Sequence, residues 1–233
     1  MFTYKHRSTT PEIMDDPSTS AQDLQAALRD ISVANRFLGG NAITFDGIQQ
    51  LLDQYPEKKD WVIADVGCGE GEILRRLCRR FRESGYTIKA IGLDLNKRSI
   101  EYAKRASADF DNLSFKAVDI LNDTVVHCDI VICTLTLHHL SDQVIVDFLT
   151  TFQKMASVGI VINDLQRSKL AAVSFKVFSR IFMRSDIARH DGLVSIQSSF
   201  TGDDLAGYAK KSGIKSYQLN WRWAFRWQWI IKI

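Results

Sequence analysis

The segment VIADVGCGEGEIL, residues 62–74, places glycines and acids at a spacing that could bind a small ligand. Gly67, Gly69 and Gly71 alternate directly behind an apolar run that contains Asp65. A glycine-rich turn after a strand usually holds phosphate, but a phosphate loop requires Lys followed by Ser or Thr, which this turn lacks. The dinucleotide fingerprint G-x-G-x-x-G also differs, because here the third glycine comes one residue early. We therefore expect the turn to hold something other than a phosphate.

Carboxylates lie near the ends of three successive apolar runs. Asp65 precedes the glycine turn, Asp94 lies near the end of TIKAIGLDL, and Asp119 near the end of LSFKAVDI. In a doubly wound sheet the carboxyl ends of the strands meet at one crevice, where an acid after the second strand can accept both ribose hydroxyls. Such an acidic crevice suits a ligand that carries an ammonium and a sulfonium. The alternative is that these acids only cap helix N-termini.

The motifs ADVGCGEG, GLDLN, AVDI and CDIVICTLTLHHL resemble the successive motifs of class I S-adenosylmethionine-dependent methyltransferases, over roughly residues 61–164. The resemblance implies S-adenosyl-L-methionine as cofactor. It implies that Asp65 meets the amino group, Asp94 the ribose and Asp119 the adenine, while the glycine backbone passes under the methionine part. The cofactor residues implied in this way are Asp65, Gly67, Cys68, Gly69, Gly71, Asp94, Leu95, Asp119, Ile120, Thr134 and Leu135.

Three histidines are candidate catalytic residues. His138 and His139 follow the fourth predicted strand in TLHHLSD, at the mouth of the crevice, and His190 lies beside Asp191 in ARHDG, which we expect to be a loop. A phenol has a pKa of about 10, so a positioned base helps its methylation at neutral pH. The alternatives are that His138 and His139 cap a helix and pack on the cofactor, and that the ARHDG segment anchors a lid.

No metal site is predicted. In the metal-dependent, catechol-type members of the family, an Asp-Asn pair after the fifth strand joins an Asp at the end of the fourth strand to hold magnesium. Here the pair is reversed to Asn163-Asp164, and the fourth strand ends in Cys133-Thr134. The chain also lacks the [DNS]-P-P-[YF] and Pro-Cys motifs of enzymes that methylate nucleic-acid bases, so we expect no nucleic-acid partner.

The segment RSKLAAVSFKVFSRIFMRSD is predicted to form a helix with apolar side chains on one side and Lys169, Lys176, Arg180 and Arg184 opposite. Three hypotheses remain open. It is a lid whose aromatics line an acceptor pocket, an interfacial helix that contacts a membrane through residues 167–184, or a packed helix with a solvated basic face. We favour the lid. The candidate substrate-binding residues are Arg36, Asp164, Phe175, Phe178, Phe182 and Arg189.

The elements that position these residues alternate along the chain. Apolar strands are expected at 61–66, 87–95, 113–120, 128–137 and 157–164, with helices between them capped by Asn96 and Ser141. This alternation predicts an α/β fold with a parallel sheet covered on both faces. Residues 201–213 read as a helix capped by Thr201, and the alternating segment 214–233 as an antiparallel strand pair with a turn near Ala224. We therefore predict a Rossmann-like, doubly wound, mostly parallel seven-stranded sheet with an antiparallel C-terminal strand pair.

One domain of 233 residues is expected, because the length and the hydrophobic fraction of 45% suit a single core. Its predicted parts are an N-terminal helical cap (1–56), a cofactor-binding core (57–164), a substrate-covering helical insertion (165–200) and the final helix and strand pair (201–233). No secretory signal or membrane-spanning run is present, and the four cysteines form no C-x-x-C pair, so a cytoplasmic location is expected.

Charge is divided unevenly along the chain. Residues 1–164 carry 18 Lys/Arg and 23 Asp/Glu, whereas residues 165–233 carry 12 and 4, so a net −5 is followed by a net +8. The basic end indicates an anionic substrate or surface, or simply a solvated face.

The segments PEIMDD, NRFLGG, RHDG and SSFT also resemble bacterial methyltransferases that act on phenolic, quinone or polyketide-type small molecules. The expected function is methyl transfer to a small, largely apolar acceptor, foremost O-methylation of a phenolic hydroxyl. The alternatives are C-methylation of a quinone precursor and a non-catalytic S-adenosylmethionine-binding partner protein.

Overall fold

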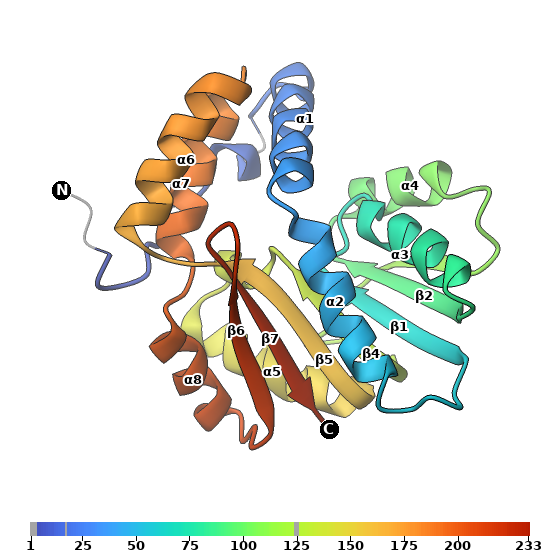
Figure 1. Cartoon of the computed structure of the whole chain (residues 1–233). Coiled ribbons are helices and arrows are strands. Elements are labelled where there is room, and N and C mark those ends of the chain that lie inside the picture. The colour runs from blue at the N-terminus through green and yellow to red at the C-terminus, as the bar shows by residue number, and fades with distance from the viewer. Residues whose placement is uncertain (1–3, 17, 124–125) are drawn as a thin grey trace.

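A seven-stranded sheet forms the centre of the computed structural model, which describes residues 4–16, 18–123 and 126–233 (Figure 1). The strand order is β3-β2-β1-β4-β5-β7-β6. The strands are β1 (Asp60–Val66), β2 (Thr87–Asp94), β3 (Leu113–Ala117), β4 (Cys128–Thr134), β5 (Ala156–Leu165), β6 (Tyr217–Arg222) and β7 (Arg226–Lys232). Strands β1 to β5 pair in parallel, and β7 pairs antiparallel with both β5 and β6. The predicted fold, including the antiparallel C-terminal pair and its turn at 223–225, is confirmed.

Helices cover both faces of the sheet because the central strands are apolar on both sides. Alternate residues such as Ile63 and Ile132 pack under α2 (Gly40–Leu52), α3 (Glu72–Glu83) and α4 (Lys97–Ala106). Their neighbours, such as Ala64 and Cys133, pack under α5 (Asp142–Met155) and α8 (Gly202–Lys211). This period of two is the pleat of a strand buried on both faces.

Local signals fix most helix ends. The Asn96 side chain accepts hydrogen bonds from the backbone N–H groups of Arg98 and Ser99 at the start of α4. Thr201 and Asp204 form a reciprocal capping box at α8. Both caps were predicted. Ser141 occupies the N-cap position of α5, but its side chain makes no capping hydrogen bond there, so that prediction holds for the position alone.

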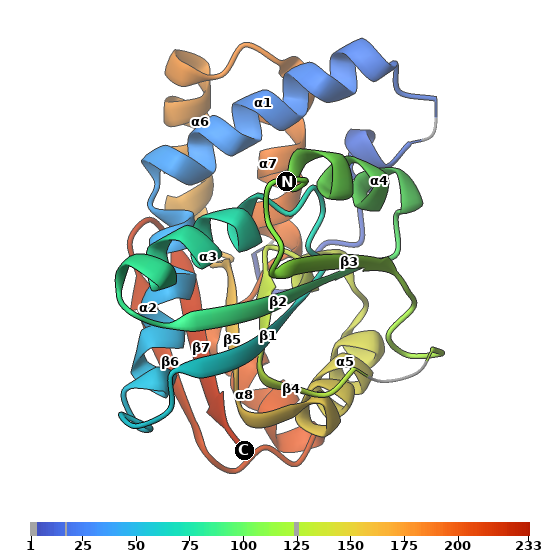
Figure 2. The ribbon, with the colours of Figure 1, turned by 90° about the vertical axis from the view of Figure 1, so that its right-hand side faces the viewer.

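A roof of helices lies over the carboxyl ends of the strands. It consists of α1 (Ala21–Phe37), α6 (Lys169–Phe182) and α7 (Asp186–Ser198), and Figure 2 shows α1 crossing above the sheet. The short η1 (Ile13–Asp15) packs against α7. None of the helices in the described part of the chain combines the length and apolarity needed to cross a bilayer.

The ARHDG segment, expected as a loop, lies inside α7 instead. Asp191 and Gly192 look like helix breakers in the sequence, which is why the helix was missed. Ser185 caps α7 by accepting from the N–H of Ala188. Gly192 has a packing role, since a Cβ there would lie 2.1 Å from the ring of Phe175. The roof therefore contains a close α6–α7 pair that periodicity alone did not reveal.

Candidate active site

A cavity of about 400 Å³ lies between the carboxyl ends of β1, β4 and β5 and the helical roof. Its floor is polar, whereas the wall from α1, α6 and α7 is apolar. The floor and rim include Glu12, Asp65, Gly67, Cys68, Thr134, Leu135, His138, His139 and Arg226, and the apolar wall includes Met14, Leu28, Ile31, Leu38, Phe175, Met183 and Ile196. A cavity of this size, with apolar walls and polar groups gathered on one side, is typical of small-molecule sites.

The glycine turn after β1 is tight because its backbone is tied to the neighbouring strand. The N–H groups of Gly67 and Cys68 both donate to the carbonyl oxygen of Leu93, at 2.8 and 3.1 Å. Gly67 has φ +75°, and a Cβ there would lie 2.4 Å from the side chain of Thr136. Glycine is therefore required at this position both by the backbone conformation and by the packing against Thr136.

Asp65 is a buried carboxylate at the cavity. Its side chain has an exposed fraction of 1%, and neither of its oxygens has a hydrogen-bond partner among residues 4–16, 18–123 and 126–233. Burial, and next the nearby charge of Asp94, raise the pKa of Asp65 well above its ordinary value. A cationic partner would stabilise the ionised form of such a buried carboxylate. The site therefore fits a ligand that brings an ammonium group to the glycine turn.

Asp94 and Leu95 lie at the tip of β2, beside the glycine turn and outside the cavity lining. The Asp94 carboxylate accepts from the N–H groups of Gly69 and Asn96, both at 2.8 Å, which leaves further lone pairs for ribose hydroxyls. Leu95 is 72% exposed, so its side chain is free to cover a flat ring.

Asp119 and Ile120 follow β3 and also lie outside the cavity lining. The Asp119 carboxylate accepts from the Asn122 side chain and from the Leu121 N–H, and these hydrogen bonds lower the pKa of Asp119 from its ordinary value. The structure thus brings Asp65, Gly67, Cys68, Thr134 and Leu135 together at the cavity. It places the remaining predicted cofactor residues, Gly69, Gly71, Asp94, Leu95, Asp119 and Ile120, along the adjacent turn and the tips of β2 and β3.

The tip of β4 adopts an unusual backbone conformation. Leu135 has φ +53°, a left-handed value that branched and bulky residues rarely adopt. It is held by a hydrogen bond from its N–H to the carbonyl oxygen of Asn163, at 2.9 Å. The preceding Thr134 hydroxyl lies 3.0 Å from that of Thr44 on α2. Such strained positions concentrate at functional sites.

His138 forms a buried ion pair with Asp164. Its Nδ1 lies 2.7 Å from Oδ1 of Asp164, and both side chains are less than 5% exposed. Burial alone would lower the pKa of His138, but the charge of Asp164, the hydrogen bond to it and the charge of Glu12 raise it above 6.5. Burial would raise the pKa of Asp164, but the charge and hydrogen bond of His138 lower it. Because Asp164 occupies Nδ1, the Nε2 atom of His138 is the one left for a ligand.

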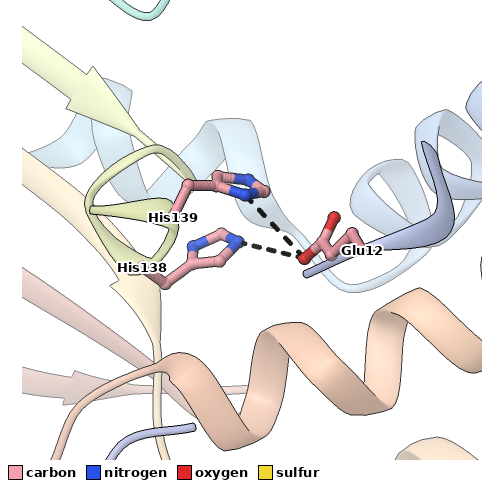
Figure 3. Close-up of side chains that lie close together, drawn as sticks. All are labelled: Glu12, His138 and His139. Atoms are coloured by element: carbon pink, nitrogen blue, oxygen red, sulfur yellow. Dashed lines mark ion pairs between the residues drawn. The ribbon is translucent and has the colours of Figure 1, made fainter. Parts of the chain in front are cut away.

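Figure 3 shows that His138 and His139 both face Glu12, which precedes η1. Oε1 of Glu12 lies 4.0 Å from Nε2 of His138 and 3.9 Å from Nδ1 of His139. Burial, and next the charge of His138, lower the pKa of His139 to about 4, so its imidazole is neutral at neutral pH. The three ligand atoms lie within 4.8 Å of one another and are a candidate metal-binding group. A metal with bonds of about 2.1 Å would need them closer, within about 4.2 Å.

The N-terminal segment is tied across this part of the site. Arg7 donates to the carbonyl oxygens of His138 and Leu140 and pairs with Asp142 at 2.7 Å. Asp191 on α7 accepts from the backbone N–H groups of Ile13 and Met14, both at 2.9 Å. These contacts hold Glu12 over the histidines.

His190 is placed away from the cavity. It is paired with Asp191 as the sequence suggested, at 2.9 Å, but it is half exposed and does not line the cavity. Buried Asp191 binds the N-terminal segment, which matches the lid-anchoring alternative. Arg189 also lies outside the cavity lining, where its guanidinium bonds the carbonyl oxygen of Met183 and Asp186.

The three candidate aromatics of α6 separate in the structure. Phe175 lines the cavity, whereas Phe178 packs into the cluster between α1 and α7. Phe182 is 54% exposed and lies against Phe178, with ring centroids 4.8 Å apart. Of the remaining candidates, Asp164 acts behind His138, and the side chain of Arg36 lies outside the described part of the chain.

Glu12 and Arg226 were not predicted from the sequence. Glu12 meets His138 across 126 positions of chain, and no local pattern signals that contact. Arg226 did carry a signal, because it alternates with Trp227 and therefore lies on the opposite face of β7, together with the buried Gln228. A cation on a buried strand face is a candidate ligand-binding residue.

Comparisons with known proteins agree with this fold. A family model described as a methyltransferase domain matches residues 57–174, just over half of the chain. A search of curated proteins found no match.

Among solved structures, the plantazolicin methyltransferase BpumL in complex with SAH has a TM-score of 0.67 at 14% identity, covering 91% of each chain. Human N-acetylserotonin methyltransferase in complex with SAM has a TM-score of 0.62 at 12% identity, covering 90% of this chain and 56% of that one. Magnesium protoporphyrin IX methyltransferase from Synechocystis PCC 6803 with bound SAM has a TM-score of 0.54 at 14% identity, covering 94% and 88%. At these identities the likeness shows the fold. Together with the family match and the motifs, it identifies the chain as a member of the methyltransferase domain family, a class I S-adenosylmethionine-dependent methyltransferase.

Proposed function

We propose that this enzyme methylates a small, largely apolar acceptor, foremost at a phenolic hydroxyl. The observation that carries the proposal is the buried His138–Asp164 pair, which borders the cavity. A hydroxyl of pKa about 10 gives up its proton slowly at neutral pH, and a positioned imidazole is suited to accept it.

The cofactor side supports methyl transfer through two features. The buried Asp65 carboxylate would receive the donor's ammonium group, and the glycine turn, which lines the cavity at Gly67 and Cys68, would lie along its methionine part. When bound, S-adenosylmethionine supplies a methyl group already activated on a sulfonium. The task left to the protein is to align the acceptor for in-line attack, exclude water and remove the acceptor's proton.

Asp164 prepares His138 for that last task. By accepting from Nδ1–H it fixes the tautomer in which Nε2 carries the free lone pair, and it stabilises the imidazolium once the proton has arrived. Thr134 and Leu135, the latter with a left-handed backbone conformation, line the same cavity as this base and the glycine turn. The apolar wall, including Ile31, Phe175 and Met183, suits a flat aromatic ring.

Two alternatives make different use of the same pair. C-methylation of a quinone precursor also needs deprotonation of the ring, so it fits the same base. A non-catalytic cofactor-binding protein has no use for a buried ion pair at its acceptor cavity, and such pairs are costly to bury. We also propose that His138, His139 and Glu12 act in proton transfer without a metal.

The test is turnover by a His138→Gln variant. We expect formation of S-adenosylhomocysteine with a panel of phenols by the wild type, and a fall in kcat of roughly 10²- to 10⁴-fold in the variant. Replacing the exposed His127 by Gln is the matched control and should leave kcat unchanged. Tight cofactor binding without product from any phenol or quinone precursor would instead support the non-catalytic alternative.

A second proposal concerns the outer face of α6, which carries an unusual number of exposed apolar side chains. Leu170, Val173, Val177, Ile181 and Phe182 are 54–68% exposed. Lys169, Lys176 and Arg180 are exposed on the same helix. The sequence predicted opposite apolar and basic faces, but here both kinds of side chain face outward. Such a helix suits the surface of an anionic bilayer, so we propose peripheral membrane contact through α6.

Flotation with liposomes tests this second proposal. We expect the wild type to float with anionic vesicles in a salt-sensitive manner, and a Val177→Asp/Ile181→Asp variant to remain unbound. Tyr102→Asp, a matched change at an exposed position of α4, should float like the wild type. Absence of wild-type flotation would leave α6 as a lid alone.

A further inference from the structure

Arg226, the first residue of β7, is a buried cation with free donors at the cavity. Its exposed fraction is 2% and it lines the cavity. Nη2 donates to Oδ1 of Asn35 at 2.8 Å, whereas Nε and Nη1 have no hydrogen-bond partner in the described part of the chain. Buried donors are nearly always paired in native proteins, and an unpaired charged group is costly. These two nitrogens therefore indicate a missing partner.

The guanidinium is fixed in place. Arg226 pairs with Leu165 across the β5–β7 ladder. Gly40, at the start of α2, lies against the group, because a Cβ there would be only 3.3 Å from Cζ of Arg226. Burial lowers the pKa of Arg226 to about 10, with the charge of Asp164 acting in the opposite direction, so the group remains a cation at neutral pH.

None of the described residues around Arg226 accepts a hydrogen bond from its Nε or Nη1. Oδ1 of Asp164 is used by His138 and by the Leu165 N–H, and Oδ2 of Asp164 makes no hydrogen bond to any described residue. Glu12 accepts from the hydroxyl of Ser195, and Asp191 accepts from backbone N–H groups. Glu12 and Asp191 are thus engaged elsewhere, and Asp164 acts on Arg226 through its charge without a hydrogen bond to it, so the two nitrogens of Arg226 are left for a ligand.

We propose that Arg226 binds an oxyanion, a carboxylate in the first place, carried by the methyl acceptor. Strand β7 is separated from β1 by β4 and β5, which puts Arg226 about 14 Å across the sheet from the glycine turn at a strand spacing of about 4.8 Å. The carboxylate of the cofactor itself is the other anion that Arg226 could bind. Because the amino-acid part of the cofactor would lie beside the glycine turn, on the other side of the sheet, the carboxylate at Arg226 is assigned to the acceptor.

An anion site at Arg226 narrows the chemical class of the methyl acceptor. This step rests on the proposed function. The apolar wall takes an aromatic body, the His138–Asp164 pair takes a hydroxyl proton, and Arg226 takes an anionic group. A hydroxyaryl carboxylate combines all three.

Binding measured without turnover tests the inference. In the presence of S-adenosylhomocysteine and at fixed ionic strength, we expect 6-hydroxy-2-naphthoate to bind at least about tenfold more tightly than the matching amide, as a charge-assisted hydrogen bond implies. Arg226→Gln should remove this preference, and Arg226→Lys should retain part of it. Equal binding of acid and amide by the wild type would overturn the inference.

Two further measurements separate the sources and the failures. If Arg226→Gln weakens S-adenosylhomocysteine but neither 5′-methylthioadenosine, which lacks the amino-acid part, nor the naphthoate, the anion belongs to the cofactor and the inference falls. Thermal unfolding verifies that the variants fold. If the Arg226 variants do not fold, Asn35→Ala is tested instead: it removes the hydrogen bond that positions Nη2 of Arg226, so we expect weaker binding of the naphthoate relative to the amide. An unchanged preference for the naphthoate would contradict the inference. Efficient methylation of phenols without a carboxylate, at the same KM, would overturn the role of Arg226 and leave the proposed function standing.

Discussion

Replacing Asp164 by Asn separates the charge of the buried pair from its shape. The Asp164 side chain is 2% exposed, and its Oδ1 lies 2.7 Å from Nδ1 of His138. Asn fills the same volume but removes the charge that raises the pKa of His138, so that burial then lowers this pKa unopposed by Asp164. Its amide can also donate to Nδ1, which moves the ring proton to Nε2 and removes the base from the cavity.

The expected loss follows from what each effect removes. A positioned base contributes roughly 10²- to 10⁴-fold, and loss of the correct tautomer in a His–Asp pair costs up to about 10⁴-fold. We therefore expect kcat to fall by roughly 10² to 10⁴, which is about 2.7–5.4 kcal/mol of barrier. The Kd for S-adenosylmethionine should not change, because Asp164 lies on the acceptor side of the site.

The assay is formation of S-adenosylhomocysteine from a phenol as a function of pH. Since the base must be neutral, wild-type kcat/KM should rise as pH passes the pKa of His138, above 6.5. In Asp164→Asn the remaining activity should rise at lower pH. His190→Gln is the control, because it alters the exposed histidine of the other His–Asp pair. If Asp164→Asn has wild-type kcat and an unshifted pH profile, His138 is not the base and the proposed mechanism is refuted.

Other predictions follow from the same contacts. Gly67→Ala should cost about 1–3 kcal/mol of unfolding free energy and abolish cofactor binding in calorimetry, because φ is +75° and the new Cβ would meet Thr136 at 2.4 Å; wild-type binding would contradict the tight-turn argument. Asp65→Asn should raise the thermal stability of the ligand-free protein while weakening S-adenosylmethionine binding at least about tenfold, since it removes a buried carboxylate without a partner; equal affinity would exclude Asp65 from the cofactor site. EDTA should leave turnover unchanged, and a loss restored by added metal would make Glu12, His138 and His139 a metal centre. Urea unfolding should show that the stabilisation from His138, whose pKa is raised, is full below pH 6.5 and lost as pH rises through that raised pKa. The contribution of Asp164, whose pKa is lowered, should be present above pH 3.8 and lost as pH falls through the lowered value. Asp164→Asn should make the unfolding free energy less dependent on pH in both ranges. An unchanged pH dependence would show that the His138–Asp164 pair does not control it.

The sheet and its connections could be predicted because their signals are local. Continuous apolar strands such as residues 128–134, alternating with capped helices, leave few alternatives to a doubly wound sheet. The carboxylates Asp65 and Asp94 are placed by the ends of those strands, so their positions at one edge of the sheet could be predicted from the strand pattern. Asp65 and Asp94 lie close together simply because β1 and β2 are neighbouring parallel strands.

The acceptor side could not be predicted in the same way, because its contacts join distant segments. Glu12 reaches His138 through the N-terminal segment that Asp191 holds. The orientation of α6 was ambiguous for a different reason. Phe175 and Val177 lie on different sides of a helix that is apolar over much of its circumference, so periodicity gives no preference for which side is buried. The packing of Phe175 against Gly192 on α7 determines which side of α6 is buried.

The unpaired buried groups on the cofactor side and on the acceptor side of the site have the same explanation. Among buried side-chain nitrogen and oxygen atoms without a partner in the described residues, the charged ones belong to Asp65, Asp164 and Arg226. All three lie at the cavity or directly behind His138. A fold that leaves such groups unpaired is less stable without ligands, so ligands that supply the missing charges should stabilise it. Asp65 lacks a cation and Arg226 lacks an anion, on opposite sides of β4 and β5, which is the charge pattern expected for a cationic donor and an anionic acceptor bound together. Thermal stabilisation should therefore be largest when S-adenosylhomocysteine and an aromatic carboxylate are both present. If the carboxylate adds nothing beyond S-adenosylhomocysteine, this account of the acceptor half is wrong.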